Sequence, residues 1–230
     1  MLNLELVVEI ACSIYFAAIL VFTLVSFTFL PFLIKHGRSI ETHKGKHSKS
    51  WFYPVTFLHN TRISKKWYCI FYMVPSLTFA AYYLFCGYFR KPLISHSKDK
   101  CPSPILMHSW RRFAETILYS RNINSKMTLL QFLHGILYFL VLSTYMAIFR
   151  LRVNIYGFLA IQILQSVSHY RVYALKSGEL LHYFLEIGIF WHIFCSVRTP
   201  SMFFNLLYVC SFVYTSIYNR LNLIKKVKIL

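Results

Sequence analysis

The chain has little acidic charge, glycine or proline. Only 7 Asp and Glu stand against 25 Lys and Arg in 230 residues, for a formal net charge of +18. Hydrophobic residues make up 57% of the chain and charged residues 14%, a balance that is unusual for a soluble domain. In a soluble protein the basic excess would indicate nucleic acid. Here it lies between long uncharged runs, so it indicates membrane topology and no nucleic-acid partner.

The motifs of several enzyme classes are missing. Neither GxGxxG nor GxxxxGK[ST] occurs, which excludes a Rossmann dinucleotide domain and a P-loop. No GxSxG motif supports covalent hydrolysis. The 10 His are dispersed and the 6 Cys lie singly without a CxxC pair, so no metal site is predicted.

Four long runs without Asp, Glu, Lys or Arg predict membrane spans, because roughly 20 apolar residues cross a bilayer. They are 10–34, 67–89, 127–149 and 199–219. Three weaker candidates are 104–119, 153–168 and 179–197. We therefore predict an all-α fold, a polytopic membrane helical bundle of about seven transmembrane helices that forms a single integral-membrane domain over 1–230. Ionisable residues inside spans usually face the bundle interior and serve a site, so the weaker spans are expected to carry it.

The distribution of basic residues predicts the orientation. If the N-terminus is lumenal, 16 of the 25 Lys and Arg residues lie in cytoplasmic segments. These segments are 35–66, 120–127, 169–178 and the residues from 220 onward. The positive-inside rule then predicts a lumenal N-terminus and a cytoplasmic C-terminus. The basic cytoplasmic loop 35–66 is compatible with a solvated loop and with contact to anionic lipid headgroups.

Three groups of polar residues recur at helical spacing in the weaker spans. His108-x-x-Arg111-Arg112-x-x-Glu115 places His108, an arginine and Glu115 on one face, where a cation could bind a phosphate or pair with Glu115. Gln165 and His169 lie one turn apart, with Lys176 beyond them. His182-Tyr183-x-x-Glu186 places an imidazole one turn from a carboxylate in an otherwise apolar helix. Structural ion pairs and an ordinary helix end remain alternative interpretations.

These motifs resemble the polyprenol reductase branch of the steroid 5-alpha-reductase family. HxxRRxxE is matched at 108–115, and HGILYF at 134–139 is similar to the family's Gly- and Tyr-containing helix. The family's QxxxHxxLxxL resembles Gln165-x-x-x-His169 running on to Leu175 and Lys176, and its PHYxxEIxIY resembles LHYFLEIGIF at 181–190. SKKWYCIFY at 64–72 and LIKHGRS at 33–39 are similar to upstream family segments. The resemblance covers roughly 30–220, with the motifs in the family's order.

The resemblance implies an NADPH-dependent oxidoreductase that saturates the alpha-isoprene double bond of a long-chain polyprenyl lipid. The reaction belongs to dolichol biosynthesis for protein N-glycosylation in the endoplasmic reticulum membrane, and KVKIL at 226–230 resembles a cytoplasmic retrieval signal. The part of the chain that carries the site is 104–220. Residues that the resemblance assigns to the NADPH pocket are Arg111, Arg112, Gln165, His169, Lys176, His182, Tyr183 and Glu186.

The chemistry of hydride transfer narrows the substrate. An isolated double bond of an allylic alcohol offers no place for the negative charge, whereas an alpha,beta-unsaturated aldehyde moves it to the carbonyl oxygen. We therefore expect polyprenal rather than polyprenol as the immediate acceptor. The candidates for the catalytic electrophile are His108, Glu115 and Tyr119, among which the sequence does not choose.

The chain also departs from the family pattern. An Asn of the family is Ala174 here, the Pro of the PHY motif is Leu181, the preceding loop is shortened and the family's C-terminal YPKxRKAxxPF-like tail is missing. These departures leave open a non-catalytic or truncated homologue that binds lipid or a partner. A membrane isoprenoid methyltransferase is a further alternative, although its RHPxYxG pattern is missing. The sequence predicts no oligomeric state.

Overall fold

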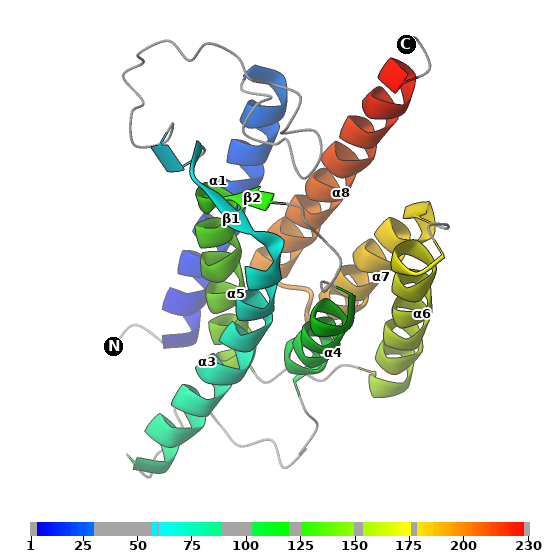
Figure 1. Cartoon of the computed structure of the whole chain (residues 1–230). Coiled ribbons are helices and arrows are strands. Elements are labelled where there is room, and N and C mark those ends of the chain that lie inside the picture. The colour runs from blue at the N-terminus through cyan, green and yellow to red at the C-terminus, as the bar shows by residue number, and fades with distance from the viewer. Residues whose placement is uncertain are drawn as a thin grey trace.

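The computed structural model describes residues 4–29, 57–58, 60–88, 103–119, 126–149, 154–175 and 179–227. In these ranges the chain forms seven long α-helices and one small antiparallel sheet (Figure 1). The elements are α1 (Leu4–Phe29), β1 (Arg62–Ser64), the 3₁₀ turn η2 (Lys65–Trp67), α3 (Tyr68–Tyr88), α4 (Pro104–Tyr119), β2 (Lys126–Thr128), α5 (Leu129–Phe149), α6 (Ile155–Tyr173), α7 (Glu179–Val197) and α8 (Pro200–Val227). The prediction of an all-α helical bundle is confirmed. Most of loop 35–66, and Lys176, lie outside the described residues.

Five of these helices are long and apolar enough to cross a membrane. They are α1, α3, α5, α7 and α8. The other two, α4 and α6, are the helices that carry most of the polar motif residues. With 16 residues, α4 is about 24 Å long at 1.5 Å per residue, shorter than a typical hydrocarbon core. The chain is therefore a multi-pass membrane protein in which two of the seven predicted spans are short or polar.

The two polar helices have the polarity pattern of a membrane protein. In α4, Ile117 and Leu118 are exposed, whereas His108 and Glu115 are buried. In α6 the exposed residues Leu159, Ile163, Leu164 and Val167 alternate with a buried polar face of Gln162, Gln165, Ser168 and His169. An apolar outside with a polar inside is costly in water and suits a lipid surround, because the polar groups find partners only inside the bundle.

The helices form two packed groups. On one side α3 packs against both α4 and α5; on the other, α6 packs on α7, α7 on α8, and α8 on α1. Figure 1 shows α3 and α5 running together on one side of the bundle and α6 and α7 on the other. Contacts of α1 with α5 and of α4 with α6 join the groups. Gly135 permits the close approach of α5 to α3, since a Cβ there would lie 2.8 Å from the Phe71 ring.

Local polar contacts fix the ends of the helices. Thr128 and Gln131 form a reciprocal capping box at the start of α5. Thr128 Oγ1 accepts from the Gln131 backbone N–H, and Gln131 Oε1 accepts from the Thr128 backbone N–H, both at 3.1 Å. The β1–β2 ribbon pairs Ile63 with Met127 just before this cap. At the start of α8, the Glu9 carboxylate of α1 accepts from the Ser201 backbone N–H at 2.8 Å. The Glu9–Ser201 contact joins α1 to α8, and the ribbon joins the segment before α3 to the segment before α5.

Candidate functional site

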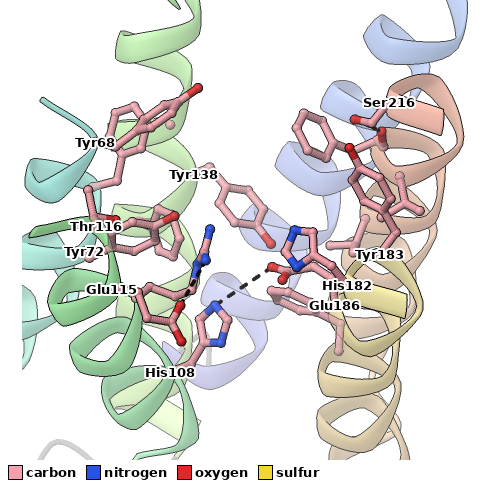
Figure 2. A pocket seen from close by; sticks show the side chains of 18 of the residues that line it. Tyr68, Tyr72, His108, Glu115, Thr116, Tyr138, His182, Tyr183, Glu186 and Ser216 are labelled. Carbon is pink, nitrogen blue, oxygen red and sulfur yellow. Dashed lines mark hydrogen bonds and ion pairs between the residues drawn. The ribbon is translucent and has the colours of Figure 1, made fainter. Parts of the chain in front are cut away.

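A cavity of about 450 Å³ lies between the two groups of helices. Its size is typical of pockets that hold small molecules or cofactors. Figure 2 shows one part of its wall made by polar side chains of α4 and α7, and another by tyrosines of α3 and α5. We call the first part the polar end, defined by His108, Arg112, Glu115, His182 and Glu186. The second, the aromatic end, is defined by Tyr68, Phe71, Tyr138, Tyr208 and Phe212.

Arg111 joins α4 to α6 behind the cavity wall. Its Nε donates to Gln162 Oε1 and its Nη2 to Gln165 Oε1, both at 2.5 Å, and its Nη1 donates to Glu115 Oε1 at 2.6 Å. Planar guanidinium groups suit such multiple contacts because their five donors have a fixed geometry. With its donors engaged by the protein, Arg111 acts as a brace between the helices and is not one of the cavity-lining residues.

Glu115 is the most fully paired carboxylate of the described residues. Oε1 accepts from Arg111 at 2.6 Å and from Ser166 Oγ at 3.0 Å. Oε2 accepts from His169 Nδ1 at 2.6 Å and from Arg112 Nη1 at 3.1 Å. Each oxygen therefore receives two donors, three of the four from ionic or imidazole groups. A buried anion with this many donors is held ionised and in place, which suits a structural role better than proton donation.

The hydrogen bonds around His108 decide which of its nitrogens carries the hydrogen. Its Nδ1 faces two donors, Arg111 Nη2 and Gln162 Nε2, each at 3.4 Å. Nδ1 is therefore the acceptor and Nε2 the donor. Nε2 lies 4.0 Å from Glu186 Oε1, as the dashed line in Figure 2 indicates. A donor and a carboxylate thus face each other across a gap too long for a direct hydrogen bond.

Glu186 has fewer partners than Glu115. Its Oε2 accepts from the Gln165 side-chain amide, and its Oε1 faces His108. Its side chain is 24% exposed, against 9% for Glu115. Glu186 is therefore the carboxylate of the site that can take on a new partner.

Arg112 lines the cavity beside these groups. Its guanidinium carbon lies 5.4 Å from the centre of the Tyr72 ring, a cation–π contact, and its Nη1 lies 2.8 Å from His169 Nε2. The ring of His169 lies 4.1 Å from that of His182, whose Nδ1 is buried without a hydrogen-bond partner.

The aromatic end carries two hydrogen-bonded polar pairs. The Tyr138 hydroxyl donates to Asn205 Oδ1 at 2.9 Å, and Tyr208 Oη lies 2.8 Å from His134 Nε2. Tyr138 and Tyr208 also pack together, with ring centroids 5.3 Å apart. These pairs are two points at which the aromatic end could bind a polar atom of a ligand.

The structure brings the three sequence motifs together around one cavity. The predicted residues that line it are His108, Arg112, Glu115, Tyr119, His182, Tyr183 and Glu186. Three others, Arg111, Gln165 and His169, lie behind this lining and hold it in place. Tyr119 stacks on Tyr173, with ring centroids 5.5 Å apart and planes 16° from parallel. The described residues contain no group of three or more His, Cys, Asp and Glu that could hold a metal ion.

Sequence reasoning missed several residues of the site. Gln162 was detectable, because it shares a helix face with Gln165 and His169 at intervals of three and four residues. Tyr138 lies in HGILYF, a segment noted for its resemblance but not assigned to the site. Tyr72 likewise ends SKKWYCIFY at 64–72, a segment noted for its resemblance but not assigned to the site. Asn205 gave no local signal, because it stands in a long apolar run and reaches the site only through packing between distant helices.

Comparisons of the chain with protein-family models, curated proteins and solved structures gave no match.

Proposed function

We propose that this chain is an NADPH-dependent reductase of a long-chain polyprenyl aldehyde. One observation carries the proposal: the residues of the three motifs, which lie on α4, α6 and α7, converge on one cavity with a polar end and an aromatic end. A dinucleotide needs charged and hydrogen-bonding partners, and an isoprenoid needs apolar ones. This cavity offers both in contact with each other.

The polar end fits the groups of a nicotinamide dinucleotide. A primary carboxamide contains an acceptor and a donor, which match the Nε2–H of His108 and the carboxylate of Glu186 on either side of the 4.0 Å gap. Arg112 lines the cavity and supplies positive charge for a phosphate. The cofactor, when bound, would supply a hydride; the protein supplies position and electrostatics.

The network behind the cavity would keep these groups in place. Arg111 and Gln165 link α4, α6 and α7, because Arg111 donates to Gln165 and Gln165 donates in turn to Glu186. With the two arginines and two glutamates ionised and the histidines neutral, the formal charges of the cluster cancel. Such a charge-balanced cluster tolerates burial, and it orients Glu186 before a ligand arrives.

The proposal includes the setting of the reaction. A polyprenal would be reduced at its alpha-isoprene double bond in the endoplasmic reticulum membrane, with the N-terminus lumenal and the C-terminus cytoplasmic. The product, after reduction of the aldehyde, is dolichol, the carrier lipid of N-glycosylation. The apolar helix surfaces support the membrane part of this setting.

The test is NADPH binding by detergent-purified protein. We expect saturable binding by the wild type, weakened at least about 10-fold by Glu186→Gln and by Arg112→Met, since each removes a charged partner. Glu9→Gln is the matched control, because Glu9 is a carboxylate of the same bundle that contacts α8 outside the cavity. A folded wild type that does not bind NADPH would refute the reductase and favour a non-catalytic lipid-binding homologue.

A further inference from the structure

The hydroxyl of Tyr138 lies where the two ends of the cavity meet. Tyr138 stands on α5, 8% exposed, with its ring in the aromatic end. Figure 2 shows its hydroxyl pointing toward the side of the cavity occupied by His182 and Glu186. An apolar chain in the aromatic end would therefore have this hydroxyl near the terminus that approaches the polar end.

The structure also fixes the orientation of this hydroxyl. Asn205 on α8 is 1% exposed and accepts the Tyr138 hydrogen bond at 2.9 Å. The ring of Tyr138 is held by edge contacts with Phe16 of α1 and Phe139 of α5, at centroid distances of 6.1 and 5.4 Å. Only the rotation of the O–H bond remains free, so the hydroxyl can leave Asn205 for a stronger acceptor without moving the ring.

The other polar groups of the cavity are less suited to stabilise a negative charge that develops on a ligand. Each oxygen of Glu115 already receives two donors. Tyr119 stacks on Tyr173, and Tyr208 is paired with His134. His108 does have a free donor at Nε2, but this donor faces the carboxylate of Glu186, which would repel a developing negative charge.

We propose that Tyr138 binds the oxygen atom at the head of the lipid, with Asn205 as its positioning residue. The proposal rests on the proposed function for its chemistry. A bound reduced nicotinamide would supply a hydride to the beta carbon of the enal and would itself be oxidised. The electron pair of the carbon–carbon double bond would move toward the carbonyl group, which leaves an enolate on the lipid. The Tyr138 hydroxyl donates to the enolate oxygen, and a proton from solvent then bonds to the alpha carbon to give the saturated aldehyde.

The role of Asn205 makes this contact selective for the transition state. A neutral aldehyde oxygen competes poorly with the amide oxygen of Asn205 for a single hydroxyl hydrogen. An enolate oxygen competes well, because hydrogen bonds to charged acceptors are about twice as strong as neutral ones. The hydroxyl therefore stabilises the charge as it develops more than it stabilises the bound substrate, which is the condition for an effect on kcat.

The first test is equilibrium binding without cofactor or turnover. Geranylgeranoic acid carries a stable anion at the position of the enolate oxygen, and geranylgeraniol is its neutral counterpart. Tyr138→Phe should weaken binding of the acid about 10- to 100-fold and binding of the alcohol less than about 3-fold, the difference between charged and neutral hydrogen bonds. Tyr145→Phe, the same atomic deletion at a buried tyrosine of α5 whose hydroxyl pairs with Thr199 outside the cavity, should change neither.

The second test is turnover of a polyprenal with NADPH. Tyr138→Phe should lower kcat about 100-fold while the Kd for NADPH stays at the wild-type value, the usual cost of losing one donor to an oxyanion. Asn205→Leu should lower kcat less, because it frees the hydroxyl but no longer aligns it.

Two results would overturn the inference: equal affinity of wild type and Tyr138→Phe for the acid, or acid binding that depends on Arg112 alone. A wild type that binds the acid through Tyr138 but does not bind NADPH would refute the reductase and leave the lipid contact standing. The experiments therefore distinguish failure of the reductase proposal from failure of the Tyr138 proposal.

Discussion

Two adjacent arginines of one helix are expected to respond differently to the same substitution. Arg111→Met and Arg112→Met each remove one positive charge from α4 and replace it with an unbranched apolar side chain. Arg111 donates to Gln162, Gln165 and Glu115 behind the cavity wall, whereas Arg112 lines the cavity. The first substitution should therefore act on stability and the second on ligand binding.

The magnitudes follow from the partners that each substitution leaves behind. Without Arg111, Glu115 loses a 2.6 Å ion pair and two buried glutamine oxygens lose their donor. Removal of one partner of a buried ion pair costs about 3–5 kcal/mol. Arg112 gives Glu115 a longer contact of 3.1 Å, so its loss should cost about 1.5–3 kcal/mol, the range for hydrogen bonds to charged groups.

The assay is thermal unfolding in detergent, together with NADPH titration of the folded fraction. At about 2–4 °C per kcal/mol for a chain of this size, Arg111→Met should lower Tm by about 6–20 °C and Arg112→Met by about 3–12 °C. NADPH binding should fall at least about 10-fold in Arg112→Met and much less in Arg111→Met at temperatures where it remains folded. Equal losses of Tm, or the reverse order of ligand binding, would refute the assignment of Arg111 as brace and Arg112 as ligand contact.

Three further predictions concern the fold. Gly135→Ala should lower the free energy of unfolding by about 1–3 kcal/mol, because its Cβ would meet the Phe71 ring at 2.8 Å. Gly188→Ala, which places its Cβ where no atom lies within 4 Å, should cause no measurable loss in the same thermal assay. Thr128→Ala removes the capping box of α5 and should cost about 0.5–2 kcal/mol, a loss that Thr128→Ser should largely avoid. A glycosylation acceptor sequence fused ahead of residue 1 should be modified in microsomes and one fused after residue 230 should not; the opposite pattern would reverse the predicted orientation.

The lengths of several helices were predictable because charge interrupts a span. The predicted ranges 104–119 and 179–197 coincide with α4 and α7, and 67–89 and 127–149 differ from α3 and α5 by no more than two residues. Counting charged residues failed at α1, which begins at Leu4 and includes Glu5 and Glu9. Glu9 is tolerated because the backbone of Ser201 and the hydroxyl of Ser13 donate to it. The contact from Ser201 comes from α8 and is invisible in the local sequence.

The end of α6 was likewise not predictable from the local sequence. Polar residues after 168 suggested the end of a span, yet α6 continues to Tyr173. His169 and Gln165 are fully buried there, bonded to Glu115 and Glu186 on the neighbouring helices. The motif residues could thus be selected from the sequence. Which of them line the cavity and which support the lining could not be predicted, because this depends on how the helices pack around the cavity.

The two glutamates of the site show how this division indicates different roles. Both are carboxylates within a few turns of a histidine, and the sequence treats them alike. Glu115 receives four donors and Glu186 receives one, with a second donor facing it at 4.0 Å. A carboxylate that is fully bonded gains nothing from a ligand and loses much when disturbed, whereas one with an open position can exchange partners at small cost. We therefore expect Glu115 to determine the geometry of the site and Glu186 to contact the ligand, and neither role follows from the spacing of the motifs that contain them.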